Sequence, residues 1–99
     1  IRPYPFNQAR IAAMKIDLKL FAAFQDLEPA GHIDLELPDG ALVADLRVAV
    51  DIYGRQHWPT FRPGLLKASA FASETTLLRD RDAIPADGKM ALLPPVNGG

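Results

Sequence analysis

The chemistry open to this sequence is limited first by the reactive side chains that it lacks. Its 99 residues include no cysteine, which excludes disulfides, thiolate metal sites and thiol nucleophiles. His32 and His57 are its two histidines. Neither has a partner at metal-ligand spacing in the sequence, so we expect no metal site. If the chain carries reactive sulfur, a main-chain group must hold it.

The terminal carboxylate of Gly99 is the main-chain group best suited to that chemistry. Gly98 and Gly99 have no Cβ and accept positive φ, so this segment could thread into a narrow channel of another protein. A free carboxylate is a poor electrophile and must first be activated, typically as an acyl-adenylate. Attack by sulfur would then give a thiocarboxylate, which is a good nucleophile near neutral pH. We therefore expect Gly99 to be the reacting residue.

Two prolines precede this terminus and would hold it away from the body of the protein. Pro94 and Pro95 have no N–H donor, so they end any strand before them and favour an extended, stiff exit. At this extension the six residues of Pro94–Gly99 would project about 18–20 Å.

Two early segments alternate strictly between apolar and polar residues, which predicts half-buried strands. Lys15–Phe21 is the first and His32–Leu37 the second. The Pro/Gly connection Glu28–Gly31 predicts a hairpin with a long loop. The inward-facing apolar residues are Ile16, Leu18, Leu20, Ile33, Leu35 and Leu37.

From Leu42 to Tyr53 the period changes to that of an amphipathic helix. The residues of its apolar stripe are Val43, Leu46, Val50 and Tyr53. Leu42 stands at the N-cap without a side-chain acceptor, but Asp45 can favour the exposed N–H groups by its charge. Gly54 stands where a left-handed C-terminal cap is expected.

The second half of the chain predicts further strands around an irregular loop. Leu65–Phe71 is the expected third strand, with Leu66, Ala68 and Ala70 on one face, and Thr75–Leu78 a short extended piece. Lys89–Leu93 is the last strand, with Met90 and Leu92 facing one side. In the loop Arg55–Gly64 we expect Trp58 and Phe61 to plug one end of the core, although an exposed contact patch is the alternative.

The composition is that of one ordinary soluble domain. Apolar residues make up 48% and charged residues 23%. A net charge of -1 provides no field that would attract nucleic acid. No apolar run reaches the length of a membrane span, so the cytoplasm is the expected compartment. The order of elements predicts an α+β fold, with a mixed sheet of about five strands and one main helix across one face.

The chain divides into three parts. Ile1–Ala13 is expected to be a disordered leader. We interpret it as an expression or upstream-start remnant, and the alternative is a native extension that packs through Tyr4 and Phe6. Met14–Leu93 forms the domain, and Pro94–Gly99 forms the extended tail.

Four segments resemble one known family. Ala91–Gly99 (ALLPPVNGG) closely matches the C-terminus of the small, sulfur-carrying subunits of molybdopterin synthase, in the ubiquitin-like sulfur-carrier family. Leu37–Leu46, Phe21–Leu27 and Asp87-Gly88 are also similar to that family, and the similarity extends over Met14–Gly99. Relatives often have other residues at three positions, which we treat as candidate partner contacts. These residues are Gln25, Leu92 and Leu93.

The resemblance implies a β-grasp fold and a role without catalytic side chains, which belong to a large subunit. An ATP-dependent, ubiquitin-activating-like adenylyltransferase would activate Gly99, and sulfuration would follow. The tail would then enter the large subunit of a heterotetramer, and the sulfur would pass to cyclic pyranopterin monophosphate. The inserted residues would be Pro94, Pro95, Val96, Asn97 and Gly98. No stably bound cofactor is implied, because ATP is used by the activating partner, and neither nucleic acid nor membrane is expected as a partner.

Three other functions stay open on the sequence alone. A sister carrier would use the same tail for thiamine, cysteine or tRNA thiolation, although the Pro-Pro-Val of Pro94–Val96 favours the molybdopterin branch. A ubiquitin-like modifier would be joined to lysines through an isopeptide bond. A plain interaction domain would make no chemical use of its terminus.

Overall fold

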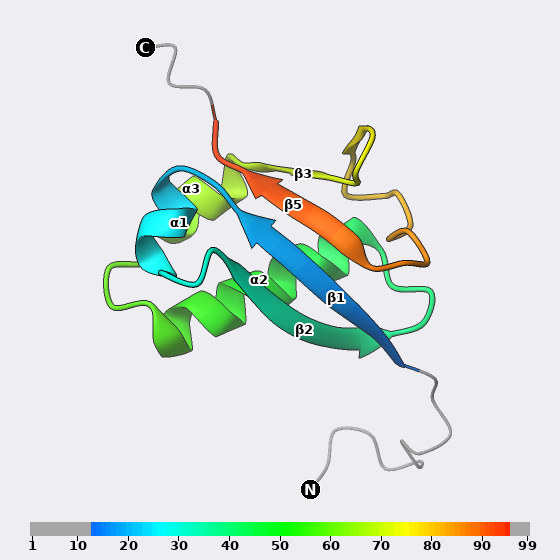
Figure 1. The fold of residues 1–99 in the computed structure, drawn as a ribbon, viewed down its shortest axis with the longest axis horizontal. Coiled ribbons are helices and arrows are strands. Elements are labelled where there is room, and N and C mark those ends of the chain that lie inside the picture. Colours follow the sequence, from blue (N-terminus) through cyan, green and yellow to red (C-terminus); the bar gives the residue numbers. More distant parts are fainter. Residues whose placement is uncertain (1–12, 96–99) are drawn as a thin grey trace, which may run out of the picture.

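The computed structural model describes residues 13–95 and arranges them as a mixed sheet with helices packed on one face (Figure 1). The sheet has five strands in the order β2-β1-β5-β3-β4. The strands are β1 (Ala13–Leu20), β2 (His32–Pro38), β3 (Ala70–Ala72), β4 (Leu77–Leu78) and β5 (Lys89–Leu93). The helices are α1 (Ala23–Leu27), α2 (Val43–His57) and α3 (Pro63–Lys67). This is the predicted α+β class, and the leader predicted for Ile1–Ala13 lies outside the described residues except for Ala13, which belongs to β1.

The first strand forms as the alternating pattern predicts. Ile16, Leu18 and Leu20 are buried, whereas the polar residues between them are exposed. β1 pairs with β2 in antiparallel fashion and with β5 in parallel. The strands predicted at both ends of the domain are therefore neighbours in the sheet.

The long helix α2 covers the inner face of the sheet with its predicted apolar stripe. Val43, Leu46 and Val50 are fully buried. At its start the Leu42 backbone N–H donates to Asp45 Oδ2 over 2.8 Å, so the carboxylate replaces the missing side-chain cap.

The prediction that Gly54 ends this helix is wrong, because α2 continues to His57. Gly54 is helical and buried, and its backbone C=O accepts from the Trp58 N–H over 2.9 Å. A Cβ on Gly54 would come within 2.8 Å of the Phe61 ring. Close packing against an aromatic ring, and not left-handed geometry, therefore accounts for glycine here.

The predicted third strand at Leu65–Phe71 is also wrong in its first half. Pro63–Lys67 is a short helix, and Pro63 stands in its first turn, where its missing N–H costs nothing. The Arg47 guanidinium donates from Nη1 to the Leu66 C=O (2.7 Å) and to the Ser69 C=O (2.9 Å). These bonds satisfy carbonyls at the helix end, and the strand is reduced to Ala70–Ala72.

Trp58 plugs the end of the core, as predicted, and is not an exposed patch. Its side chain is 3% exposed and packs near Phe61, with ring centroids 5.8 Å apart. Its indole Nε1 donates to Glu28 Oε1 over 3.0 Å, which satisfies the buried donor. The Tyr53 hydroxyl contacts the same carboxylate oxygen. Burial, followed by the nearby Glu28 charge and this hydrogen bond, raises the pKa of Tyr53 above its usual range.

Among the described residues, no helix combines the length and the apolar character that a membrane crossing requires.

Because the apolar face of α2 is buried against the sheet, truncation of Leu46 on that face should cause a large loss of stability. Leu46→Ala should lower the free energy of unfolding by about 2–5 kcal/mol, because the side chain is fully buried. Val48→Ala on the same helix is the matched control, since Val48 is 59% exposed and should change the value by under about 0.5 kcal/mol. Urea denaturation measures both, and equal effects would show that the two faces of α2 are assigned wrongly.

Candidate functional site

The described part of the chain ends where the C-terminal segment leaves the sheet. β5 lies between β1 and β3 and places Leu92 beside Leu20 on one side and Phe71 on the other. Pro94 and Pro95 follow outside any strand, with Pro94 half-buried and Pro95 exposed. The strand therefore stops at the predicted prolines, which have no N–H to continue the ladder. The predicted reacting residue Gly99 and the tail residues Val96, Asn97 and Gly98 lie outside the described residues.

A tight turn fixes the start of β5. Gly88 has φ +69°, a left-handed conformation that L side chains rarely adopt. It is buried against β1, and its C=O accepts from the Asp17 N–H over 2.9 Å. A Cβ at Gly88 would collide with the backbone carbonyl oxygen of Lys15. Only glycine allows β5 to begin this close to β1.

The two strand residues proposed as partner contacts face opposite sides of β5. Leu92 is fully buried in the core, so its side chain is not available at the surface for the contact that we expected. Side chains alternate along a strand, so Leu93 shares the outer face with Ala91 and Lys89. Leu93 and Ala91 are half-buried and Lys89 is exposed.

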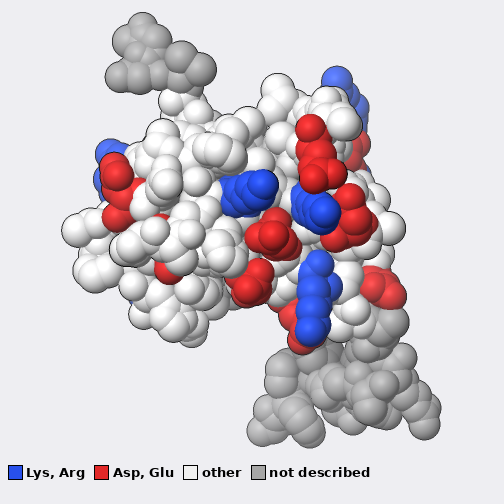
Figure 2. Space-filling view, viewed as in Figure 1, with Lys and Arg blue, Asp and Glu red and all other residues white. Residues whose placement is uncertain are grey.

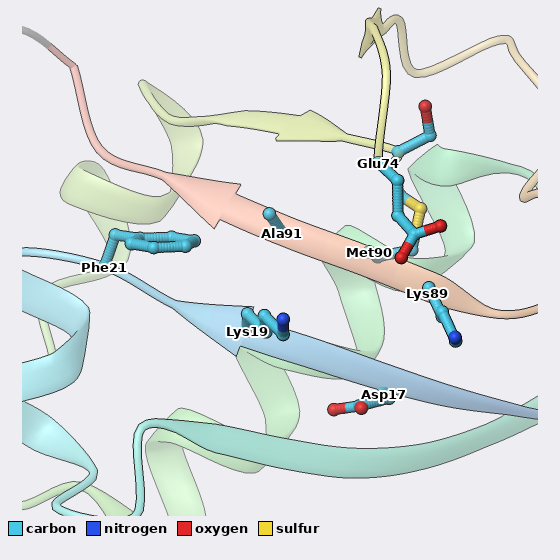
Figure 3. Close-up of a pocket in the computed structure, with 8 residues that line it drawn as sticks. Asp17, Lys19, Phe21, Glu74, Lys89, Met90 and Ala91 are labelled. Atoms are coloured by element: carbon cyan, nitrogen blue, oxygen red, sulfur yellow. The ribbon is translucent and has the colours of Figure 1, made fainter.

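The outer face of the sheet is hollowed between β1 and β5. The hollow has a volume of about 460 Å³. Figure 3 shows the Phe21 ring projecting from the end of β1 toward Ala91 on β5, with Lys19 on the neighbouring part of β1 and Lys89 at the other end of the hollow. Phe21 is 42% exposed. It is an aromatic side chain partly open to solvent, next to the strand that leads to Pro94 and Pro95.

Phe21 was not singled out as a site residue from the sequence, although a signal was present. The alternation of Lys15–Phe21 places Phe21 on the same face as Lys19 and Asp17, the solvent side. An aromatic residue at a position of the polar face breaks the alternation, and an exposed apolar side chain of this kind is a signal for a binding surface. Ala91, which lines the same hollow, could not be found this way, because its place beside this face of β1 depends on the parallel pairing of β1 with β5.

Gln25 joins the same region of the surface. It is exposed on α1 and lines a second hollow together with Phe21, Lys19 and His32. Of the three predicted contact residues, Gln25 and Leu93 thus lie on the surface around Phe21, and Leu92 lies beneath it.

The charges of the outer face are mixed. Figure 2 shows basic and acidic side chains interleaved over much of this face, and a largely uncharged area near the end of β5. A face of this kind favours a partner through apolar contact near Phe21 and specific ion pairs around it, and it has no single-sign field.

His32 has close acidic neighbours that sequence spacing did not reveal. Its Nδ1 lies 3.5 Å from Asp17 Oδ1 on β1 and 3.9 Å from Asp34 Oδ1. Three donor atoms of these residues lie within 4.8 Å of one another, but all three residues are exposed. Hydrated surface carboxylates of this kind are common without an ion, so the cluster is not by itself a metal site.

The sheet order, the helix across one face and the exit beyond β5 define the class of protein. The chain is a ubiquitin-like β-grasp domain. SAMP1 from Haloferax volcanii has the same fold, with a TM-score of 0.62 and 22% identity over 89% of this chain and 100% of SAMP1. The Haloferax volcanii HVO 2177 protein gives a TM-score of 0.64 at 22% identity, covering 88% of each chain. These likenesses show the fold alone.

A curated relative shows the family. The chain is 40% identical over 88 residues to the molybdopterin synthase sulfur carrier subunit of Synechococcus elongatus, covering 85% of this chain and 96% of the relative. No family model matches the chain. The chain belongs to the family of molybdopterin synthase sulfur carrier subunits.

The turn before β5 yields a prediction that separates backbone strain from steric collision. Gly88→Ala should destabilise the domain by more than Gly40→Ala, because both glycines have positive φ but a Cβ at Gly40 meets nothing within 4 Å. We expect about 1–2 kcal/mol for Gly40→Ala, the cost of left-handed geometry. Chemical denaturation of both variants measures the difference, and equal losses would mean that Gly88 does not constrain the approach of β5 to β1.

Proposed function

We propose that this chain is the sulfur-carrying small subunit of a molybdopterin synthase and that the carboxylate of Gly99 carries the sulfur. Membership of the sulfur carrier subunit family is the observation that carries the proposal. The Pro-Pro-Val-Asn-Gly-Gly ending and the absence of cysteine agree with it. The exit of Pro94 and Pro95 from a central strand also supports it, because the segment that follows starts from a fixed point.

The reaction needs two partners in turn. In the first step a Gly99 carboxylate oxygen attacks the α-phosphorus of ATP on an adenylyltransferase, and pyrophosphate leaves. A sulfide equivalent then attacks the acyl carbon, AMP leaves, and the thiocarboxylate remains. On the large subunit the thiocarboxylate sulfur attacks a carbon of cyclic pyranopterin monophosphate, and an oxygen substituent leaves that carbon with the bonding electron pair. Water then hydrolyses the resulting thioester, which leaves a thiol on the pterin and restores the Gly99 carboxylate. The catalytic side chains for these steps belong to the partners. The last step takes place in a heterotetramer of this chain with the large subunit.

The residues of this chain bind the partner and orient the terminus. Gly98 and Gly99 give the terminus the narrow cross-section that a channel requires. Affinity for a partner must come from elsewhere, because two glycines offer little apolar area. The surface formed by Phe21, Ala91 and Leu93 lies beside the exit of the tail and can supply it.

Alkylation of the sulfurated chain tests the chemistry directly. The chain is expressed together with its adenylyltransferase and sulfurating partner and is treated with iodoacetamide. Because the sequence has no cysteine, rapid alkylation that maps to the C-terminal peptide reports a thiocarboxylate. Mapping is essential, since oxidation of Met14 or Met90 mimics the mass of an oxygen-to-sulfur exchange. Ladders on lysines without alkylation would instead show a protein modifier, and neither product would leave a plain interaction domain.

Deletion of Gly99 should abolish sulfur transfer without affecting stability. The hydrophobic core of the described residues lies between Ile16 and Leu92, so the thermal midpoint should stay within about 1 °C of the parent value. Addition of one residue after Gly99 should abolish transfer equally, because the carboxylate is moved. Conversion of cyclic pyranopterin monophosphate in the presence of the large subunit provides the assay. If the parent chain transferred sulfur to another acceptor and not to this one, it would be a sister carrier.

Phe21→Asp should weaken binding to the large subunit about ten- to a hundredfold, the usual effect of losing an aromatic anchor. Val48→Asp is the matched control, because Val48 is exposed on α2, which packs against the opposite face of the sheet. Isothermal titration calorimetry measures both affinities. Equal affinities for the two variants would exclude the outer face near Phe21 as the docking surface.

A further inference from the structure

β2 forms one edge of the sheet in the part of the chain that the structure describes (Figure 1). Two backbone hydrogen bonds of β1 fix which backbone groups of β2 face this edge. The Leu20 N–H donates to the Gly31 C=O, toward β2, whereas the Asp17 N–H donates to the Gly88 C=O, toward β5, each over 2.9 Å. Bonding direction alternates along a strand, so the even-numbered residues of β1 face β2.

The register then assigns the residues of β2. Ile16 and Leu18 lie opposite Leu35 and Ile33, and these pairs form the ladder. The N–H and C=O groups of the alternate residues of β2 therefore point away from β1, to the free edge. Those residues are His32, Asp34 and Glu36. Among residues 13–95 no strand pairs with these backbone groups, so they form a row of donors and acceptors of the kind that can template another strand.

The side chains along this edge have opposite character on its two faces. His32, Asp34 and Glu36 are exposed on the outer face. On the inner face Leu35 and Leu37 are only half-buried, so part of their apolar area is uncovered. An added strand would thus meet acidic groups on one side and apolar groups on the other.

The acidic groups of this edge are not neutralised by cations of the described residues. The Asp34 side chain is 77% exposed, and the His32 imidazole is the one basic group of residues 13–95 within 4.0 Å of its carboxylate. In the same part of the chain no Lys or Arg nitrogen lies within 4.0 Å of the Glu36 carboxylate. Lys15 lies opposite Glu36 in the register of β1 with β2 but forms no ion pair with it, so both carboxylates can still accept from a partner.

We propose that the free edge of β2 binds an extended segment of a partner protein by strand addition. The segment has basic side chains at alternate positions, facing Asp34 and Glu36, and apolar side chains between them, facing Leu35 and Leu37. Backbone hydrogen bonds provide the affinity, and the alternation provides the specificity. Pro38, which has no N–H, limits the paired stretch to the residues before it.

A second copy of the chain fits this edge poorly. Symmetric antiparallel pairing of two β2 strands about Leu35 would place Asp34 of one copy opposite Glu36 of the other. Like charges directly opposite each other destabilise a strand pair. The same carboxylates that attract a basic segment therefore act against self-association.

This edge adjoins the surface assigned to sulfur transfer only at His32, which also lines the hollow beside Phe21 and Gln25. The sheet order places β1 between β2 and β5, and the backbone groups of the edge point away from β1. A segment bound to β2 would extend the sheet and leave β5 free. The inference therefore does not depend on the proposed function.

Amide hydrogen exchange followed by NMR tests the proposal on the full chain. The probe is a synthetic peptide with blocked termini and the sequence Lys-Val-Lys-Val-Lys-Val-Lys, and the control is the same peptide with Glu in place of Lys. In the free chain the amides of His32, Asp34 and Glu36 should exchange fast, and those of Ile33 and Leu35 slowly. At millimolar Lys peptide the exchange at His32, Asp34 and Glu36 should slow at least tenfold, and the Glu peptide should have no effect.

Substitutions at the edge sharpen the test. Asp34→Pro removes an N–H that takes no part in the β1 ladder, so it should abolish protection by the Lys peptide while the exchange of Ile33 stays slow. Asp34→Ala keeps that N–H and should retain weaker protection. The double substitution Asp34→Lys with Glu36→Lys should reverse the preference between the peptides, so that the Glu peptide protects the edge amides and the Lys peptide does not.

Three outcomes would overturn the proposal. Absence of protection by the Lys peptide, or protection mapped elsewhere, would show that this edge does not accept a strand of the stated chemistry. Slow exchange at His32, Asp34 and Glu36 that is lost on removal of residues 1–12 would identify the N-terminal segment as the occupant. Protection of these amides that increases with protein concentration would identify a second copy of the chain as the occupant.

Discussion

The parallel pairing of β1 with β5 is the constraint on which the rest of the structure depends. These strands stand at opposite ends of the described chain, and every other element lies between them in sequence. Leu18 lies beside Met90 and Leu20 beside Leu92, all in the core. Because a parallel pair needs a crossover connection, this contact cannot form locally. The residues that precede the tail are therefore held by the whole domain.

This pairing also creates the candidate surface. Strand side chains alternate between faces, so the register that buries Met90 and Leu92 brings Ala91 and Leu93 to the outer face beside Phe21. One set of hydrogen bonds thus fixes both the core and the surroundings of the tail. A shift of one residue in β5 would exchange the two sets and destroy both. The close approach of Gly88 to Lys15 opposes such a shift, because it fixes where β5 begins.

Sequence periodicity was sufficient for the elements with long, regular patterns. β1, β5 and most of α2 bury the stripe that their apolar spacing predicts, whereas β2 buries Ile33 fully and leaves Leu35 and Leu37 half-buried. It failed for short segments, whose structure is decided by tertiary contacts. α3 replaces a predicted strand where Arg47 from α2 donates to the Leu66 carbonyl in the helix and to the Ser69 carbonyl just after it. α1 was not predicted, although it buries Phe24. Gly54 was misassigned because the Phe61 ring that requires it comes from a later loop.

The candidate site also has parts that a single segment of sequence predicts and parts that depend on tertiary contacts. The tail was predicted from local sequence, and the part of it that the structure describes, Pro94 and Pro95, follows the end of β5 as expected. The predicted roles of Val96–Gly99 stay predictions. Phe21 and Ala91 belong together only through strand pairing, and His32 meets Asp17 only across two strands. A feature that one segment encodes can be predicted from one sequence. A feature that two distant segments share needs the register, which no single segment encodes.

A carrier that offers one terminus to several partners faces a constraint on its binding surfaces. The terminus contributes little affinity, so each partner that receives it must also bind the body near the end of β5. In the proposed function, partners that use the surface around Phe21 would bind one after another, since each would occupy the same area. Asp34 and Glu36 on β2 lie beyond β1 and do not line the hollow beside Phe21. A segment bound to them could stay in place while the terminus passes between the proposed partners. Taken together, the two proposals assign sequential binding to one surface of the sheet and continuous binding to another.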